Sequence, residues 1–346
     1  MPRARIHVIP TRGPDDVSGL QALIADGELQ PDKLIAILGK TEGNGCVNDF
    51  TRAFAVSAFK RTLGEAAEGV SMVMSGGTEG ALSPHIVTFE VLEVTTTDHA
   101  MAIGAKISPD IAPHQIGTFA QIECVAAAVR EAIEAADIST PEDVHFVQVK
   151  CPLLTADRVA RSAEPVVTAD TLKSMGQSRG ASALGVALAL GEIDEKTAQT
   201  TRIGHDTTVW SGRASTSAGV ELMGHEILVL GMSNKWSGPL VVDHAIMNDA
   251  IDSLSVSEAL ARLGVGVDAR LRAVFAKAEA STSGRVRGHR HTMLDDSDIS
   301  STRHARAFVG GVLAGLTGRT DLFISGGAEH QGPDGGGPVA VIAERF

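Results

Sequence analysis

Three serine residues, each leading a turn of small residues, are the first candidates for chemistry in this chain. Each follows an apolar or small-residue run, and the segments are Ser75-Gly-Gly-Thr-Glu-Gly80, Ser215-Thr-Ser-Ala-Gly-Val220 and Ser325-Gly-Gly-Ala-Glu-His330. A serine hydroxyl becomes a good nucleophile when a neighbouring base takes its proton. Because similar segments recur at long intervals, they predict a site built from three related parts.

A lysine and an arginine also recur ahead of each of the three serines. A lysine ends an apolar run ahead of each serine, and an arginine at a predicted helix start lies between the two: Lys40, Lys150 and Lys277, with Arg52, Arg179 and Arg303. Cationic groups that share a pocket lower each other's pKa, so that a neutral lysine becomes available as a base. Arginine also binds carbonyl-rich or anionic ligands and stabilises developing oxyanions. The pattern predicts a Ser/Lys site for acyl transfer or amide hydrolysis.

Carboxylates near the lysines favour one of the three pairs as the working pair. Lys40 and Lys277 each have a glutamate two residues further on, a spacing that in a strand places both side chains on the same side. A nearby carboxylate favours the charged ammonium, which is a poor base. Lys150 has no such neighbour in the sequence, so we expect Lys150 and Ser215 to be the working pair. Pairs that are interchangeable or purely structural remain the alternative.

The elements that must position these residues also recur three times. Each third of the chain is predicted to contain strand, helix, strand, helix, strand and strand, with the lysine ending the second strand and the serine following the third. A polar stretch at 155–174 is interpreted as an insertion in the middle third. The pattern predicts an α/β fold of three similar units around a pseudo-threefold axis, with units at 1–98, 104–231 and 237–346.

Composition narrows the class of protein. The chain of 346 residues is long enough to bury a substantial core, and its 43% hydrophobic and 21% charged residues are typical of soluble globular proteins. A net charge of −12 argues against a nucleic-acid partner. No apolar run approaches the roughly 20 residues that span a bilayer, and the N-terminus lacks a signal-peptide core. Three cysteines are an odd number, so we expect a reduced, cytoplasmic protein without a membrane partner.

The loop after the third serine differs from the other two. It runs from Ala328 to Pro338 and is rich in glycine and proline. Such a loop can turn backbone carbonyls inward, and with the carboxylate of Glu279 these carbonyls would offer the oxygen ligands that hard cations prefer. The loop is therefore a candidate site for a hard cation.

At these residues the chain resembles the cyanuric acid hydrolase and barbiturase family. The resemblance is nearly end to end and is strongest in the segments Gly39–Arg52, Met74–His85, Ser215–Leu222 and Ser325–Gln331. It implies a triangular three-unit fold, often a homotetramer, that opens a cyclic amide ring by hydrolysis without an organic cofactor.

The resemblance also implies roles for the matching positions. Ser215 would be the nucleophile and Lys150 its activating base. The substrate-binding residues would be Lys40, Arg52, Ser75, Gly76, Arg179, Thr216, Lys277, Arg303, Ser325 and Gly326. A structural magnesium or calcium ion would bind Glu279 and backbone groups of Ala328, Gln331, Gly332, Pro333 and Gly336.

Cyanuric acid is the favoured substrate, because its flat ring repeats carbonyl and N–H three times and so matches three near-equivalent residue sets. Attack by Ser215 would give an acyl-enzyme, which water releases as carboxybiuret, and loss of carbon dioxide would then give biuret. Two alternatives stay open. One is a barbiturase, which opens barbituric acid to ureidomalonate, and the other is a non-catalytic binder of small cyclic anionic metabolites.

Overall fold

The computed structural model describes residues 1–95, 99–265 and 270–345. Each third of the chain contains the six predicted elements in the predicted order. The first unit comprises β1 (Pro2–Pro10), α1 (Ser18–Ala25), β2 (Leu34–Thr41), α2 (Phe50–Leu63), β3 (Ser71–Gly76) and β4 (His85–Glu93). The second comprises β5 (Ala100–Ile107), α3 (Phe119–Ala135), β6 (Val144–Pro152), α4 (Ala156–Ala160), α5 (Thr171–Ala189), α6 (Glu195–Thr200), β7 (Ala214–Gly219) and β8 (Glu226–Ser233). The third comprises β9 (Leu240–Met247), α7 (Ser253–Arg262), β10 (Leu271–Ala278), β11 (Arg285–Val286), β12 (His289–Arg290), α8 (Ser301–Thr317), β13 (Phe323–Gly326) and β14 (Gly337–Glu344).

Each unit forms a four-stranded mixed sheet with the same topology. The strand orders are β1-β4-β2-β3, β5-β8-β6-β7 and β9-β14-β10-β13. In every sheet the last two strands are parallel, and these are the strands that carry the lysine and the serine. Parallel strands joined by a crossover helix end at the same edge of the sheet. The topology therefore brings a lysine and a serine together at one edge three times, which confirms the predicted three-unit α/β fold.

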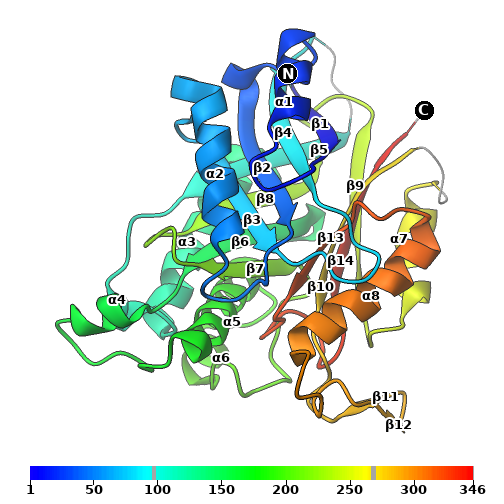
Figure 1. Cartoon of the computed structure of the whole chain (residues 1–346). Helices are drawn as coiled ribbons and strands as arrows, with labels where there is room; N and C mark the ends of the chain where they lie inside the picture. The colour runs from blue at the N-terminus through cyan, green and yellow to red at the C-terminus, as the bar shows by residue number, and fades with distance from the viewer. Residues whose placement is uncertain (96–98, 266–269, 346) are drawn as a thin grey trace.

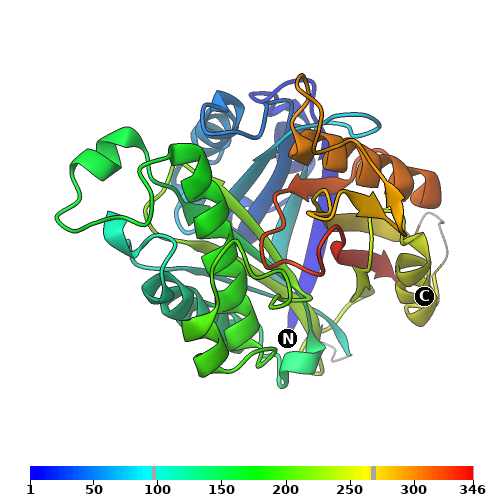
Figure 2. The same ribbon diagram turned by 90° about the horizontal axis from the view of Figure 1, so that it is seen from below.

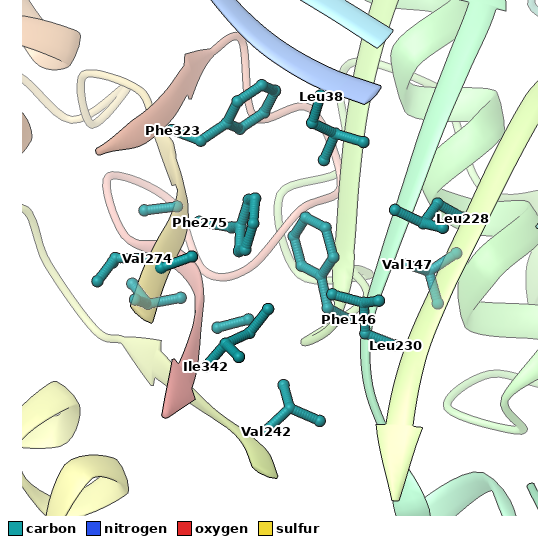
Figure 3. Close-up of a cluster of buried hydrophobic side chains, with 14 of the residues drawn as sticks. Leu38, Phe146, Val147, Leu228, Leu230, Val242, Val274, Phe275, Phe323 and Ile342 are labelled. Carbon is teal, nitrogen blue, oxygen red and sulfur yellow. The ribbon is translucent and has the colours of Figure 1, made fainter. Parts of the chain in front are cut away.

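The sheets face one another, and the helices lie outside them (Figures 1 and 2). Figure 3 shows side chains of all three units meeting between the sheets, among them Leu38 of β2, Phe146 of β6 and Phe275 of β10. The rings of Phe146 and Phe275 lie 5.1 Å apart, and Phe323 lies 5.7 Å from Phe275. Aromatic pairs at such distances add about 1 kcal/mol each beyond the area they bury. This common core holds the three strand edges in fixed relative positions.

Some of the predicted unit boundaries fall on residues that the structure does not describe. The predicted end of the first unit at residue 98 and the last residue of the chain, 346, lie outside the described residues. The second sheet begins at Ala100 and ends at Ser233, so it extends past both ends of the predicted range 104–231. The third sheet begins at Leu240 and ends at Glu344.

The middle unit differs from the prediction in its arginine-bearing helix. Helix α5 begins at Thr171, where the side chain of Asp170 caps the backbone N–H of Lys173. Arg179 therefore lies in the middle of the helix and not at its start. The predicted insertion at 155–174 contains the short helix α4 and leads into α5. Within the described parts of the chain, no helix combines the length and apolar character needed to cross a bilayer.

Candidate active site

The three lysines are fully buried, and they connect the three units in a cycle. Each lysine donates a hydrogen bond to a backbone carbonyl of a neighbouring unit: Lys40 to Ile324 at 2.7 Å, Lys150 to Met74 at 2.9 Å and Lys277 to Thr216 at 2.9 Å. Ile324 and Met74 directly precede Ser325 and Ser75. By the same rule the third serine is the one after Thr216, which is Ser217.

Strand register gives the same answer and corrects the prediction for the second unit. Lys40 lies opposite Ser75, Lys277 lies opposite Ser325, and Lys150 lies opposite Ser217. Ser215 lies opposite Gln148, and its hydroxyl donates to Gln148 Oε1 at 2.8 Å. The prediction that Ser215 is the counterpart of Ser75 and Ser325 is therefore wrong by two residues. Ser217 and Ala218, and not Ser215 and Thr216, correspond to Ser75 and Gly76.

The three register-matched serines lie side by side. Ser75 Oγ and Ser217 Oγ are each 3.3 Å from Ser325 Oγ. Lys40 Nζ and Lys277 Nζ each donate at 3.2 Å to the serine of their own unit. Three hydroxyl groups thus meet near the pseudo-threefold axis, with an amine behind at least two of them.

Three arginines surround the serines, and one differs from the prediction. Arg52, Arg179 and Arg306 line the same small cavity as the serines. Arg303 does not reach this cavity, although it was predicted to bind substrate. Helix α8 begins at Ser301, and residues 303 and 306 lie only about 60° apart around the helix axis but about 4.5 Å apart along it; Arg306 lines the cavity and Arg303 does not. Arg306 is also the more buried, with 3% of its surface exposed.

Glutamates that the sequence analysis missed hold two of these arginines. Arg306 Nε donates to Glu79 Oε2 at 2.8 Å, and Arg179 Nε donates to Glu329 Oε2 at 2.8 Å. Each pair joins two units. A signal in the sequence was available, because Ser-x-Gly-x-Glu occurs at 75–79, 217–221 and 325–329. The same pattern identifies Ser217 as the third serine.

The third glutamate behaves differently. Glu221 binds Lys150, with 2.9 Å between Oε1 and Nζ, while Arg52 donates to the backbone carbonyls of Cys46 and Ala218. The argument that Lys150 lacks a carboxylate partner is therefore wrong, because the partner comes from a distant turn. The argument also fails for Glu42, which is exposed to solvent two residues after Lys40.

Burial lowers the pKa of all three lysines. The pKa of Lys40 falls well below its ordinary value, with Arg306 adding to the effect of burial. Burial and the charge of Arg179 lower the pKa of Lys277 to about 7. Burial also lowers the pKa of Lys150, although the carboxylate of Glu221 opposes this shift. A buried lysine surrounded by cations readily becomes the neutral amine that can serve as a base.

The structure brings most of the predicted substrate-binding residues together. The cavity is lined by Gly45, Arg52, Ser75, Gly76, Met175, Arg179, Ser217, Ala218, Arg306, Ser325 and Gly326. Thr216 is fully buried behind this lining, where its N–H donates to Gln331 Oε1 at 2.7 Å and its carbonyl accepts from Lys277. Lys40 and Lys277 support the serines from behind. The site therefore combines hydroxyl groups, cationic groups and backbone groups in three copies.

The predicted cation ligands lie beside the third serine turn. Glu279, Ala328, Gly332 and Pro333 line one cavity of about 200 Å³. Gln331 and Gly336 are outside this lining, and the side chain of Gln331 is already engaged by Thr216. Burial and the nearby charge of Glu329 raise the pKa of Glu279. A buried carboxylate next to another carboxylate and several carbonyl groups is a donor set that suits a hard divalent cation.

Comparison with known proteins places this arrangement in a family. A family model described as "Amidohydrolase ring-opening protein" matches residues 5–344. The chain belongs to this family of ring-opening amidohydrolases. It is 58% identical to the cyanuric acid amidohydrolase of Azorhizobium caulinodans over 355 residues, covering 100% of this chain and 99% of that protein. It is 57% identical to the cyanuric acid amidohydrolase of Bradyrhizobium sp. (strain ORS 375), covering 99% and 98% of the two chains.

Solved structures agree with this result. The crystal structure of the cyanuric acid hydrolase from A. caulinodans superposes with a TM-score of 0.96 at 58% identity and covers 100% of both chains. A further cyanuric acid hydrolase structure has a TM-score of 0.95 at 45% identity, again over 100% of both chains. The three-unit fold is therefore the fold of these enzymes.

Proposed function

We propose that this chain hydrolyses cyanuric acid, opening the ring to carboxybiuret, which then loses carbon dioxide to give biuret. The observation that carries the proposal is the threefold set of serine, lysine and arginine around one cavity. Cyanuric acid presents three equivalent carbonyl and N–H edges, so each edge can meet one set. The cyanuric acid amidohydrolases that are 57–58% identical to the chain over nearly its full length support the same substrate.

Ser217 is the proposed nucleophile and Lys150 the proposed base. A neutral lysine amine has two N–H bonds and one lone pair. Lys40 and Lys277 each donate toward three acceptors, one of which is the serine oxygen. Lys150 donates to only two acceptors among the described residues, Met74 O and Glu221 Oε1. Its lone pair is then available to take the proton of Ser217, its register partner on the neighbouring parallel strand, in the role of a general base.

The proposed reaction proceeds in two stages. Ser217 Oγ bonds to a ring carbonyl carbon while its proton passes to Lys150 Nζ, and the carbonyl oxygen becomes an oxyanion. The adjacent ring C–N bond then breaks, and the ring nitrogen takes the proton from Lys150. Water adds to the resulting carbamoyl ester and releases carboxybiuret from Ser217. The other serine turns and the three arginines orient the ring and stabilise the oxyanion, the role that such preorganised donors play in acyl transfer.

The divalent cation is also part of the proposal. Glu279 and the carbonyls of Ala328, Gly332 and Pro333 would hold magnesium or calcium, whose charge would offset the buried carboxylate. The loop that these residues form also carries Gln331, which binds the N–H of Thr216 next to Ser217. When this loop is ordered, Gln331 holds Thr216 and thereby keeps the adjacent nucleophile, Ser217, in place.

Parallel assays with cyanuric acid and barbituric acid test the substrate. The expected result is loss of ring ultraviolet absorbance with cyanuric acid, formation of biuret, and little turnover of barbituric acid. Turnover of barbituric acid alone would move the assignment to ring opening of that substrate. Binding of either compound without any turnover would identify a non-catalytic binder.

A further inference from the structure

We propose that His145, Asp243 and His244 form a binding site for a zinc-like transition-metal ion, at the joint between the second and third units. This inference is independent of the proposed function. His145 lies on β6 of the second unit, whereas Asp243 and His244 lie on β9 of the third. One ligand atom from each residue falls within 4.8 Å of the others, and no other group of at least three such residues meets that criterion among the residues that the structure describes.

The distances between the donor atoms fit the size of a metal ion. His145 Nδ1 is 2.9 Å from His244 Nδ1 and 3.4 Å from Asp243 Oδ1, and His244 Nδ1 is 3.9 Å from the same carboxylate oxygen. A point equidistant from these three atoms lies about 2 Å from each, which is the bond length of zinc to imidazole nitrogen and carboxylate oxygen. The three donor atoms are therefore close enough together to contact one ion.

The protonation states explain why a metal suits this cluster. The two imidazole nitrogens lie 2.9 Å apart, so one proton at most lies between them, donated by one nitrogen to the lone pair of the other. A bound cation accepts both lone pairs at once. Neutral imidazole is the common nitrogen ligand of zinc, and two imidazoles with one carboxylate leave the fourth position of a tetrahedral site open.

The surroundings orient the donors. Arg262 Nε donates to Asp243 Oδ2 at 2.7 Å, which directs Oδ1 toward the histidines. The backbone N–H of His244 donates to Oδ1 at 2.7 Å and fixes the carboxylate further. Hydrogen bonds of this kind commonly orient metal-ligating carboxylates. Arg213 and Arg262 both act electrostatically on His244 and oppose a cation, so the affinity depends on the carboxylate of Asp243.

The cluster is accessible, and it is remote from the candidate active site. Side-chain exposure is 16% for His145, 12% for Asp243 and 20% for His244. A cavity of about 550 Å³ reaches His244 from solvent. His145 precedes Lys150 by five residues on β6, which places the two about 16 Å apart along the strand. A metal here would join two units and would not take part in catalysis.

These metal donors occur at one contact between units and not at the equivalent positions of the other two units. The fold itself therefore does not require them. The residues five positions before the other lysines are Ile35 and Arg272, and neither is a metal ligand. The positions that register with His244 in the other sheets are Val8 and Ala105. The threefold fold therefore forms twice without these donors.

Cobalt(II) titration of the full-length, metal-stripped protein tests the site, because cobalt replaces zinc and gives visible ligand-field bands. We expect intense bands that saturate at one equivalent, are displaced by zinc, and disappear in His145→Gln and in His244→Gln. His289→Gln removes an exposed histidine elsewhere and should leave the bands unchanged, as should Glu279→Ala at the other cavity. Circular dichroism verifies that each variant is folded.

A second measurement reports the link between the units. Zinc should raise the Tm of the wild-type protein and of His289→Gln, but not that of His145→Gln or His244→Gln. Absence of saturable cobalt bands in the wild-type protein would overturn the proposal. Bands that persist in both histidine variants would also overturn it, because they would locate the ion elsewhere.

Discussion

Lys150 Nζ lies 2.9 Å from Glu221 Oε1, and this contact breaks the threefold equivalence of the site. The corresponding glutamates of the other turns, Glu79 and Glu329, bind arginines. Burial raises the pKa of Glu221, but the charges of Lys150 and Arg52 outweigh it and lower this pKa to about 2. Glu221 is therefore a carboxylate at neutral pH, and it holds one amine in a geometry that the other two amines do not share.

Replacement of Ser217 by alanine should abolish turnover, because the proposed nucleophile is lost. We expect kcat to fall by about 10³-fold or more while cyanuric acid still binds, as measured by single-turnover assay and by calorimetry. Ser215→Ala is the matched control, since Ser215 is also buried, two residues away on the same strand, and bonds to Gln148. It should cost about 1 kcal/mol of folding free energy and retain most of kcat. Loss of turnover in Ser215→Ala with retention in Ser217→Ala would contradict the register-based assignment.

Glu221→Gln should move the acid limb of the pH profile to lower pH. The proposed base is neutral Lys150, so kcat/KM rises with pH as this amine loses its proton. The carboxylate of Glu221 raises the pKa of Lys150, and its removal lets the amine deprotonate at lower pH. Profiles of kcat/KM for the wild-type protein and the variant measure this shift. An acid limb that stays in place, or moves to higher pH, would show that Lys150 is not the titrating base.

Arg306→Ala should weaken substrate binding, whereas Arg303→Ala should not. Arg306 lines the cavity and is bound by Glu79, while Arg303 is outside the lining. Loss of charged hydrogen bonds in a buried site typically costs about 1.5–3 kcal/mol, or about 10- to 150-fold in kcat/KM. Steady-state kinetics of both variants decide the question, and equal effects would mean that Arg303 contributes to substrate binding as much as Arg306 does.

Removal of the proposed cation should loosen the loop that supports Ser217. Calcium or magnesium should raise the Tm of the chelator-treated wild-type protein, because an ion that binds only the folded state stabilises it. Glu279→Ala should abolish this rise, since the variant lacks the only side-chain carboxylate predicted as a ligand. Differential scanning calorimetry with and without the cation tests the prediction. An equal rise in the variant would place the ion at a different site.

Acid should destabilise the fold because two buried histidines take up protons only when the chain unfolds. Burial lowers the pKa of His225 to about 4, and burial likewise lowers the pKa of His85 to about 4. An unfolded histidine titrates near 6.5, so the unfolded state binds more protons between about pH 6.5 and 4. The free energy of unfolding should therefore fall through this window, by on the order of 3 kcal/mol for each histidine.

Urea unfolding at a series of pH values measures this loss. In His225→Gln the free energy of unfolding should fall less steeply with decreasing pH, because glutamine does not titrate. His85 should account for the slope that remains. His225 also bonds to Ser108 and Gln121, so the comparison uses the slope with pH and not the absolute stability. A slope that is identical in the variant would mean that His225 does not titrate in the unfolding transition.

The sequence by itself determined the three-unit fold, because apolar periodicity and recurring turns are local properties of the chain. The positions of Lys40 and Ser75, and of Lys277 and Ser325, followed from the same patterns. The turn at Ser217 was misread because Ser215 also follows small residues, and only the parallel register between β6 and β7 distinguishes two serines on one strand. Two residues that are two positions apart on a strand point to the same face, so they look equivalent in the sequence. Only the pairing of each residue with the neighbouring strand distinguishes them.

Only the tertiary structure decided which residues meet across units. Arg303 and Arg306 both lie in the first two turns of α8, and the packing of that helix against the sheet places only Arg306 at the cavity. Lys150 and Glu221 are 71 positions apart, so no local pattern shows their contact. His145 and His244 are 99 positions apart and belong to different units. Such pairs arise from the packing of whole sheets, and this packing depends on the shared core around Phe275 rather than on any single segment.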